Sequence, residues 1–327
     1  MSRFTILVLM LLLLNNVFGQ QKDSHDTAYY ETYPELVTLR TYYSKKFTGF
    51  NVDFPQLGGT VLKYAPNTTN NLGVGATYRW ATLNLAYGFG FMNPDQGRGN
   101  TRYLDLQTHQ YFGKWNIDAF GQFYRGYYLR SPELPDYEKY LRPDLDVYEF
   151  GLAFQRVFNH EKLSFRAAFL NNEYQKRSAG SFLLGGNMFT GKLDADSTLV
   201  PSELDADPGN DYRKLRFLKV GVNAGYVYHL VINKNWFAVA SITISLNTGT
   251  YRLDAPESFF RETYFSGDLG SRIAIGYNSE RFTFSTFYVD QRVQVTGDYR
   301  NILNTGNFRF VIAYRIHPPD YLREIFE

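Results

Sequence analysis

The feature that most constrains the fold is an alternation of large apolar residues with small or polar ones, sustained over segments of about ten residues or more. In the segment 216–231 the large residues are Leu218, Val220, Val222, Ala224, Tyr226, Tyr228 and Leu230. Between them lie Lys219, Gly221, Asn223, Gly225 and His229. The segments 82–91 and 307–316 follow the same rule. A period of two indicates strands with unlike faces, and about ten residues is the length of a tilted strand that crosses a bilayer.

A soluble sandwich also alternates, so it is the main alternative to a membrane barrel. Soluble strands usually have about five or six residues, roughly half the length found here. Aromatic residues make up 18% of the chain, and several gather near segment ends, where an interfacial girdle would lie. These are Trp80, Phe91, Trp115, Tyr127, Tyr128 and Trp236. The pattern favours an all-β fold, a closed antiparallel transmembrane β-barrel.

The N-terminus has the pattern of a secretory signal peptide. Arg3 precedes a mostly apolar run from Phe4 to Leu14, and polar Asn15 and Asn16 and then Val17-Phe18-Gly19 follow. The run is shorter than the roughly 20 residues that span a bilayer, which disfavours a membrane anchor. We therefore expect a signal peptide at 1–19, a polar lead at 20–35 and a mature chain in the outer membrane of a Gram-negative cell, in contact with its lipid.

Tight turns and long connections alternate along the chain. Outer-membrane barrels place short turns in the periplasm and long loops outside. With both termini periplasmic, this ordering predicts about twelve strands, within a range of about ten to fourteen. Their spans are 36–46, 71–80, 82–91, 102–112, 115–129, 146–158, 161–170, 216–231, 236–250, 263–277, 281–293 and 307–316.

Two segments do not fit this ordering. Residues 182–189 resemble a strand, but counting it would put a long connection in the periplasm, so we assign it to an extracellular loop that folds inward. Residues 47–63 are similar, and their insertion with a partner would bring the count to about fourteen. The barrel domain is expected to cover 36–316. A tail at 317–327 follows it, because Pro318-Pro319 cannot continue a strand.

The polar face of each strand should line the lumen. The phase predicts that Val222→Arg is rejected by lipid and that Asn223→Arg is tolerated. The polar lumen candidates carry both signs of charge, which fits either a filled interior or a water-filled pore. They are His109, Asp118, Asp105, Gln122, Arg166, Lys219, Asp268, Arg272 and Arg309.

One pair is specified more closely than the others. A two-residue turn at Gly113-Lys114 places His109 opposite Asp118, with both side chains in the lumen. A carboxylate against an imidazole is the supporting half of a general-base arrangement. Catalysis would need a nucleophile from another strand, and no serine is marked for that role. A lumen ion pair is the simpler interpretation, so we assign no catalytic residue.

Other chemistry finds little support. The chain has no cysteine, which excludes disulfides and thiolate metal sites. Its five histidines lack metal-ligand spacing, and no hydrolase motif is present. The net charge of +2 does not favour nucleic acid as a partner. We expect no metal, no cofactor and no enzyme activity.

Three stretches resemble an outer-membrane protein family of Bacteroidota that is catalogued as a domain of unknown function. They are residues 36–46 (LVTLRTYYSKK), residues 62–67 (LKYAPN) followed by 71–75 (NLGVG), and residues 175–182 (QKRSAGSF). The resemblance covers nearly all of the mature chain. It implies an outer-membrane location and a single domain, and it carries over no functional residues.

Three functions stay open at this point. The first is an accessory or structural subunit of an outer-membrane assembly, with other outer-membrane or periplasmic proteins as partners. The second is a channel or transporter for small solutes, and the third is an outer-membrane hydrolase. The radius of the lumen separates the first two, and a third polar side chain near His109 would favour the last.

Overall fold

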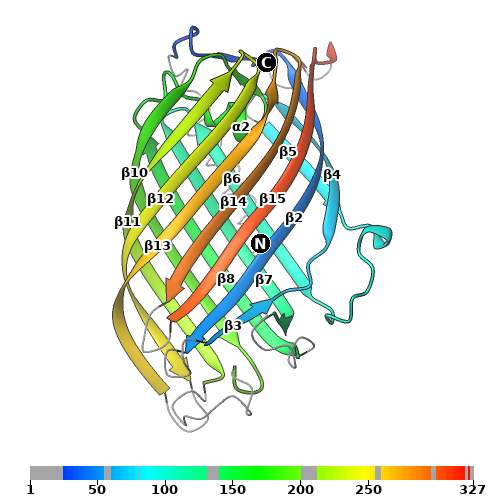
Figure 1. Cartoon of the computed structure of the whole chain (residues 1–327). Coiled ribbons are helices and arrows are strands. Elements are labelled where there is room, and N and C mark those ends of the chain that lie inside the picture. Colours follow the sequence, from blue (N-terminus) through cyan, green and yellow to red (C-terminus); the bar gives the residue numbers. More distant parts are fainter. Residues whose placement is uncertain are drawn as a thin grey trace.

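The computed structural model describes residues 25–54, 60–79, 81–130, 140–199, 212–254, 259–295, 300–320 and 323–324. The expected signal peptide and Trp80 lie outside these residues. One antiparallel sheet dominates the fold and curls into a barrel (Figure 1). No helix in the described residues is both long and apolar enough to cross a membrane.

Ten strands pair in a closed circuit, because the strand Arg300–Ile316 near the C-terminus also pairs with the strand Val37–Phe54 near the N-terminus. In spatial order they are β2 (Val37–Phe54), β3 (Thr60–Ala65), β7 (Trp115–Leu129), β8 (Leu141–Val157), β10 (Ala179–Asp194), β11 (Lys214–Ile232), β12 (Trp236–Asp254), β13 (Phe259–Asn278), β14 (Phe282–Val295) and β15 (Arg300–Ile316). The prediction of a closed antiparallel barrel is confirmed.

Three further strands widen one half of the barrel. β4 (Asn70–Tyr78) pairs with the first part of β2, and β5 (Ala81–Tyr87) pairs with β4. A short 3-10 helix (Gly90–Met92) follows, and then β6 (Arg102–Phe112) pairs with β7. The register of β7 shifts at Gly126, where a φ of 90° lets the strand change partner from β6 to β3. Between β2 and β7 the wall is therefore β3 in one half and β4, β5 and β6 in the other.

The two ends of the barrel differ. The terminal end holds the start of β2, the end of β15 and the short connections at 113–114, 233–235 and 279–281. The loop end holds Phe54, Leu129, Asp194, Asp254 and Val295. Short turns mark the periplasmic end of such barrels, so we expect the terminal end to face the periplasm.

The prediction of a strand at 161–170 is wrong. Residues 165–169 form the short helix α2 (Phe165–Phe169), and the Ser164 hydroxyl accepts a hydrogen bond from the Ala167 amide at 3.0 Å to cap it. The strand β9 (Glu173–Gln175) follows and pairs with β1 (Tyr30–Thr32) from the N-terminal lead. We call residues 25–36 and 158–178 together the plug, because they close the terminal end of the barrel.

The assignment of 182–189 to an extracellular loop is also wrong. These residues lie in β10, which pairs with β8 and β11 as part of the wall. Residues 47–54 extend β2, and Thr60–Ala65 form β3. Every other predicted span overlaps an observed strand.

The outer surface of the wall is apolar. On β11, Leu218, Val222 and Tyr226 are 50%, 64% and 44% exposed, whereas Lys219 and Asn223 between them are buried. Outward-facing leucine, isoleucine and phenylalanine recur on the other wall strands. A closed barrel with this surface satisfies its backbone hydrogen bonds internally and presents hydrocarbon to lipid. The protein is an outer-membrane β-barrel.

The substitution Val222→Arg is expected to lower the free energy of unfolding by about 2–4 kcal/mol, because it places a charge in lipid near the middle of β11. Urea titrations in lipid vesicles, read by heat-modifiable migration, measure this loss. Asn223→Arg is no longer a tolerant control, since Asn223 is 2% exposed and bonded to Gln155 at 3.1 Å. Gln107 is half-buried and bonded to Asp105 at 3.3 Å, so Gln107→Arg is the better control. Equal losses at 222 and 107 would contradict the assigned orientation.

Candidate functional site

At the loop end the lumen is filled by apolar side chains. Every strand of the closed circuit contributes to this loop-end cluster, and residues of the connection after β10 fold in to join it. Its largest fully buried members are Tyr64, Tyr124, Tyr212, Phe50, Leu62, Leu129, Leu145, Leu193, Leu199 and Leu215. The expectation of a polar inward face therefore fails in this half of the barrel. In the described residues, no open lumen passes through the loop-end cluster.

A polar layer lies beneath the loop-end cluster, and the predicted His109–Asp118 pair is part of it. The two residues are opposite in register, which confirms the prediction from the Gly113-Lys114 turn. The Nδ1 of His109 lies 2.6 Å from Oδ1 of Asp118. Arg272 donates to the other carboxylate oxygen and to the Tyr111 hydroxyl, the latter at 3.0 Å. Asp118 therefore binds the Arg272 guanidinium as well as the His109 imidazole, which is typical of a structural ion-pair network.

The described residues place no nucleophile beside the His109–Asp118 pair. Among the described residues, no serine or threonine hydroxyl forms a hydrogen bond with His109. Nor does the described part of the chain bring three histidine or acidic side chains together as a metal site. The arrangement can hold charge and orient an imidazole, but it lacks the third group that nucleophilic catalysis needs.

Asp105 is the centre of a second network. Its carboxylate accepts hydrogen bonds from Lys46 at 3.1 Å, Gln122 at 3.2 Å and Tyr124 at 2.6 Å. Gln122 also accepts a bond from the hydroxyl of Thr305 at 3.0 Å, across the lumen. The predicted neighbours Asp105 and Gln122 are therefore brought together, and they link β6 and β7 to β15.

Lys219 and Asp268 form a completely buried ion pair. The Lys219 ammonium lies 2.6 Å from Asp268 Oδ1, and both side chains are 0% exposed. Asn247 and the Gln294 amide donate to the same carboxylate at 3.0 and 2.9 Å. The Lys219 ammonium also donates to the Ser266 hydroxyl at 3.5 Å and to the Gln294 carbonyl at 2.9 Å. These four hydrogen bonds offset the desolvation of the two charges, and the network joins the wall strands β11, β12, β13 and β14.

The two remaining candidates lie elsewhere. The Arg309 guanidinium stacks over Tyr42 at 4.5 Å and Phe287 at 5.6 Å, and the described residues offer it no carboxylate partner. Arg166 is on α2 in the plug rather than on a wall strand, and its Nε lies 3.2 Å from Glu173.

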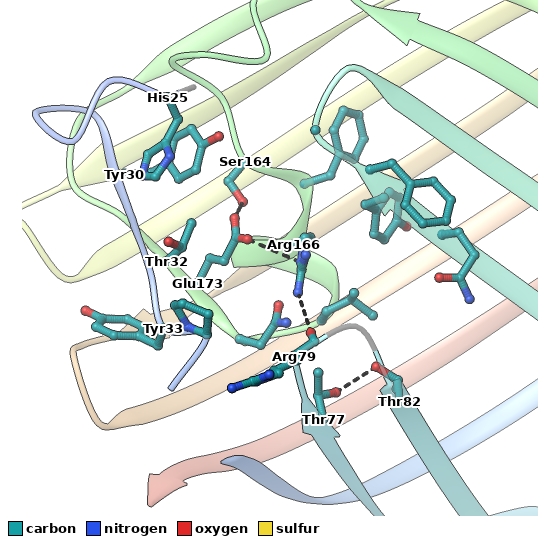
Figure 2. Close-up of a pocket in the computed structure, with 18 of the residues that line it drawn as sticks. His25, Tyr30, Thr32, Tyr33, Thr77, Arg79, Thr82, Ser164, Arg166 and Glu173 are labelled. Carbon is teal, nitrogen blue, oxygen red and sulfur yellow. Dashed lines mark hydrogen bonds and ion pairs between the residues drawn. The ribbon is translucent and has the colours of Figure 1, made fainter. Parts of the chain in front are cut away.

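A cavity of about 990 Å³ lies between the plug and the wall. Figure 2 shows Arg166 and Glu173 facing each other beside Ser164, with Arg79, Thr77 and Thr82 across from them. Ser164 donates to Glu173 at 2.5 Å, and Arg166 donates to the Arg79 carbonyl at 3.4 Å. The cavity is large enough for a ligand and is lined by both polar and apolar side chains, which makes it the candidate binding site.

Tyr33 lines the same cavity from the N-terminal lead. Burial raises the pKa of its phenol to about 12, although the Arg315 guanidinium stacked on its ring at 4.9 Å opposes this shift. The group therefore stays a neutral hydroxyl near neutral pH.

Sequence reasoning missed this cavity and its residues. Ser164 and Glu173 are absent from the predicted lumen residues, because the alternation predicts a strand over 161–170 and Glu173 lies outside every predicted strand. The capping serine three residues before Ala167 is the signal that could have indicated a helix.

Comparison with protein families gives one match. The profile of a family described as "Domain of unknown function (DUF4421)" matches residues 24–316. The chain belongs to this family. No curated protein matches its sequence significantly.

Several solved structures share the barrel architecture at low similarity. The outer-membrane protease OmpT from Escherichia coli is 10% identical, with a TM-score of 0.38 over 87% of this chain and 98% of that one. The translocator domain of the autotransporter NalP from Neisseria meningitidis is 6% identical, with a TM-score of 0.36 over 95% of each chain. The toluene transporter TodX of Pseudomonas putida is 8% identical, with a TM-score of 0.24 over 88% of this chain and 92% of that one. At these values none of the likenesses bears on function.

Proposed function

We propose that this barrel is a non-conducting, non-enzymatic subunit of a larger outer-membrane assembly. The observation that carries the proposal is the filled lumen. The loop-end cluster occupies one half of it, and the plug closes the other. A channel for small solutes would need both to move. A signal peptide and a Bacteroidota outer membrane as its destination belong to the same proposal.

An exposed aromatic surface beyond the membrane-spanning part of the wall supports the role of a subunit. Among the described residues, Leu269–Asn278 of β13 pair with β14, and the preceding residues of β13 pair with β12. This first part of β13 extends past β14 at the loop end (Figure 1). It carries Phe259 and Phe265, which are 64% and 82% exposed. Because the ten residues that pair with β14 suffice to span a bilayer, we place this first part of β13 outside the membrane. Large exposed aromatic side chains of this kind are typical of protein–protein contact surfaces.

A photo-crosslinking amino acid at Phe265 tests the proposal in living cells. We expect it to capture a protein partner, since Phe265 is 82% exposed on the part of β13 that extends past β14. The matched control is Ile273, which points outward from the same strand but within the wall, and is 52% exposed. The purified barrel should also give no conductance in a planar bilayer. Equal capture from both positions, or stable single-channel steps, would contradict the proposal.

The hydrolase alternative is tested at His109. If the His109–Asp118 pair is structural, any cellular phenotype of His109→Ala should follow the amount of folded barrel in the membrane. Complete loss of function at a normal level of folded protein would instead assign chemistry to this pair.

A further inference from the structure

Basic side chains gather on the outer surface of the barrel around the segment 88–101, which connects β5 to β6 and projects sideways from the wall (Figure 1). They come from β2, from this segment, from β6 and from the end of β7, and all of them are exposed. Lys45 points outward, since its neighbour Ser44 is buried and Lys46 bonds to Asp105 in the lumen. We call this set the basic rim, and its members are Lys45, Arg98, Arg102, Arg125 and Arg130.

The basic rim lies at the border of the apolar outer surface that is nearest the loop end. β6 has 11 residues, about the length with which a tilted strand crosses a bilayer, and Arg102 is its residue nearest the loop end. Leu104 and Leu106, the next outward-facing residues of β6, are 54% and 42% exposed. Lys45 is opposite Phe308, an outward-facing aromatic residue of the kind that marks the membrane interface. The rim is therefore level with the lipid headgroups.

Two arginines of the rim face each other across a strand pair. Arg102 and Arg125 are directly opposite in register, and like charges in this position destabilise the pairing of β6 with β7. Arg125 lies 3.7 Å from Asp146, whereas Arg102 forms no ion pair with the described residues. The pair of arginines therefore carries more positive charge than the described part of the barrel neutralises.

The other three cations of the rim are also close together. Arg98 and Arg130 are near enough to Lys45 for their charges to act on its ammonium group. Within the described part of the chain, none of the three forms an ion pair. Asp95, the acidic residue of the segment 88–101, accepts a hydrogen bond from the Gly97 amide at 2.9 Å. Cations gathered in this way raise the local positive potential, which favours an anionic partner.

Hydrogen bonds fasten the segment that carries Arg98. Asn67 donates from its backbone to the Thr101 hydroxyl and from its side chain to the Gly99 carbonyl, both at 2.7 Å. The Arg98 guanidinium lies over the Tyr128 ring, 5.5 Å from the ring centroid. An arginine side chain that is already ordered loses less conformational entropy when it binds a ligand. These contacts therefore prearrange the rim for an anion.

We propose that the basic rim binds the phosphate of a lipid headgroup in the leaflet at the loop end, while the acyl chains of this lipid lie on the adjoining apolar surface. Arginine suits this role because its guanidinium binds phosphate through two parallel hydrogen bonds. The loop end is expected to face the cell exterior, where the lipid A anchor of lipopolysaccharide carries phosphate groups. This site does not depend on the assembly role, because it is formed by β2, β6, β7 and the segment 88–101, whereas Phe265 is on β13.

The test uses the purified full-length barrel in detergent, stripped of lipid, and bisphosphorylated lipid A. Native mass spectrometry counts the lipid molecules that each chain retains, and we expect saturable binding of one lipid A per chain. The double substitution Arg98→Gln with Arg102→Gln should weaken this binding about tenfold or more. The matched control is Arg216→Gln with Arg261→Gln, which removes two exposed arginines from β11 and β13 and should leave binding unchanged. Heat-modifiable migration checks that both variants fold.

The wild-type barrel provides a second measurement that needs no substitution. Lipid A without its phosphates keeps the same acyl chains and should bind about tenfold more weakly than bisphosphorylated lipid A. Inorganic phosphate at the same concentration should not displace lipid A, because it lacks the acyl chains. Equal binding of the two lipids to the folded wild-type barrel would overturn the proposal. So would equal affinities of the two double variants for lipid A, or displacement of lipid A by inorganic phosphate.

Discussion

Replacing Lys219 with methionine is expected to lower the free energy of unfolding by about 3–5 kcal/mol. Methionine keeps much of the length and volume of the lysine side chain, so the substitution isolates the charge. It leaves the Asp268 carboxylate, which is 0% exposed, without its cation. An uncompensated charge in this position has no route to solvent. Urea titration of the folded barrel in lipid vesicles measures the loss.

Two controls separate the charge from the packing. The double substitution Lys219→Met with Asp268→Asn removes both charges, so it should recover much of the stability that Lys219→Met loses. Arg252→Met breaks the more exposed pair with Asp254, whose side chains are 45% and 20% exposed, and should cost less than about 1 kcal/mol. Equal losses for Lys219→Met and Arg252→Met would contradict the complete burial of the Lys219–Asp268 pair.

The second large effect is expected at Arg315, which fastens the plug to the wall. Its guanidinium donates to the Asn171 and Glu173 carbonyls of the plug at 2.8 and 3.0 Å. It also donates to the Ser279 and Glu280 carbonyls of the β13–β14 turn at 2.6 and 3.1 Å. Arg315→Met removes every one of these donors and should cost about 3 kcal/mol or more. The plug should then become sensitive to protease added from the terminal end.

Arg309→Met is the matched control for this prediction. Arg309 points inward from the same strand, but it contacts rings and donates no hydrogen bond to the described residues. Its replacement should cost about 1 kcal/mol. Release of the plug by Arg315→Met should still produce no conductance, because the loop-end cluster fills the other half of the lumen. Stable ion flow through the Arg315→Met barrel would show that the plug alone closes a pore, and would favour the channel.

The wall could be predicted because its signal is local. A strand between lipid and lumen needs one apolar face, so apolar and polar residues alternate along it, as Val222 and Asn223 do. The opposition of His109 and Asp118 was predictable for the same reason, since a two-residue turn sets the register of the strands that it joins. Segments with clear alternation and short turns were therefore assigned correctly.

The plug misled the prediction because it imitates a strand. Around α2, Leu163, Phe165 and Ala167 alternate with Ser164 and Arg166. That period of two arises because apolar residues pack inside the barrel while Ser164 and Arg166 meet Glu173. This error also affected β10. With a strand at 161–170, a further strand at 182–189 would place the long connection after it at the terminal end, where short turns are expected. Because 161–170 lies in the plug, the connection at the terminal end is instead 158–178, which is long but folds into the lumen.

The sequence by itself determined the membrane-spanning wall and which face of each strand meets lipid, because both depend on neighbours along one strand. Only the tertiary structure decided what fills the lumen and which strands form each part of the wall. The loop-end cluster forms from side chains such as Phe50, Tyr124 and Leu215, which come from different strands and meet only after the barrel closes. The wall between β2 and β7 likewise depends on the tertiary structure, because β3 replaces three strands in one half of the barrel. Contacts across a closed barrel join residues that are far apart in the chain, so no local pattern records them.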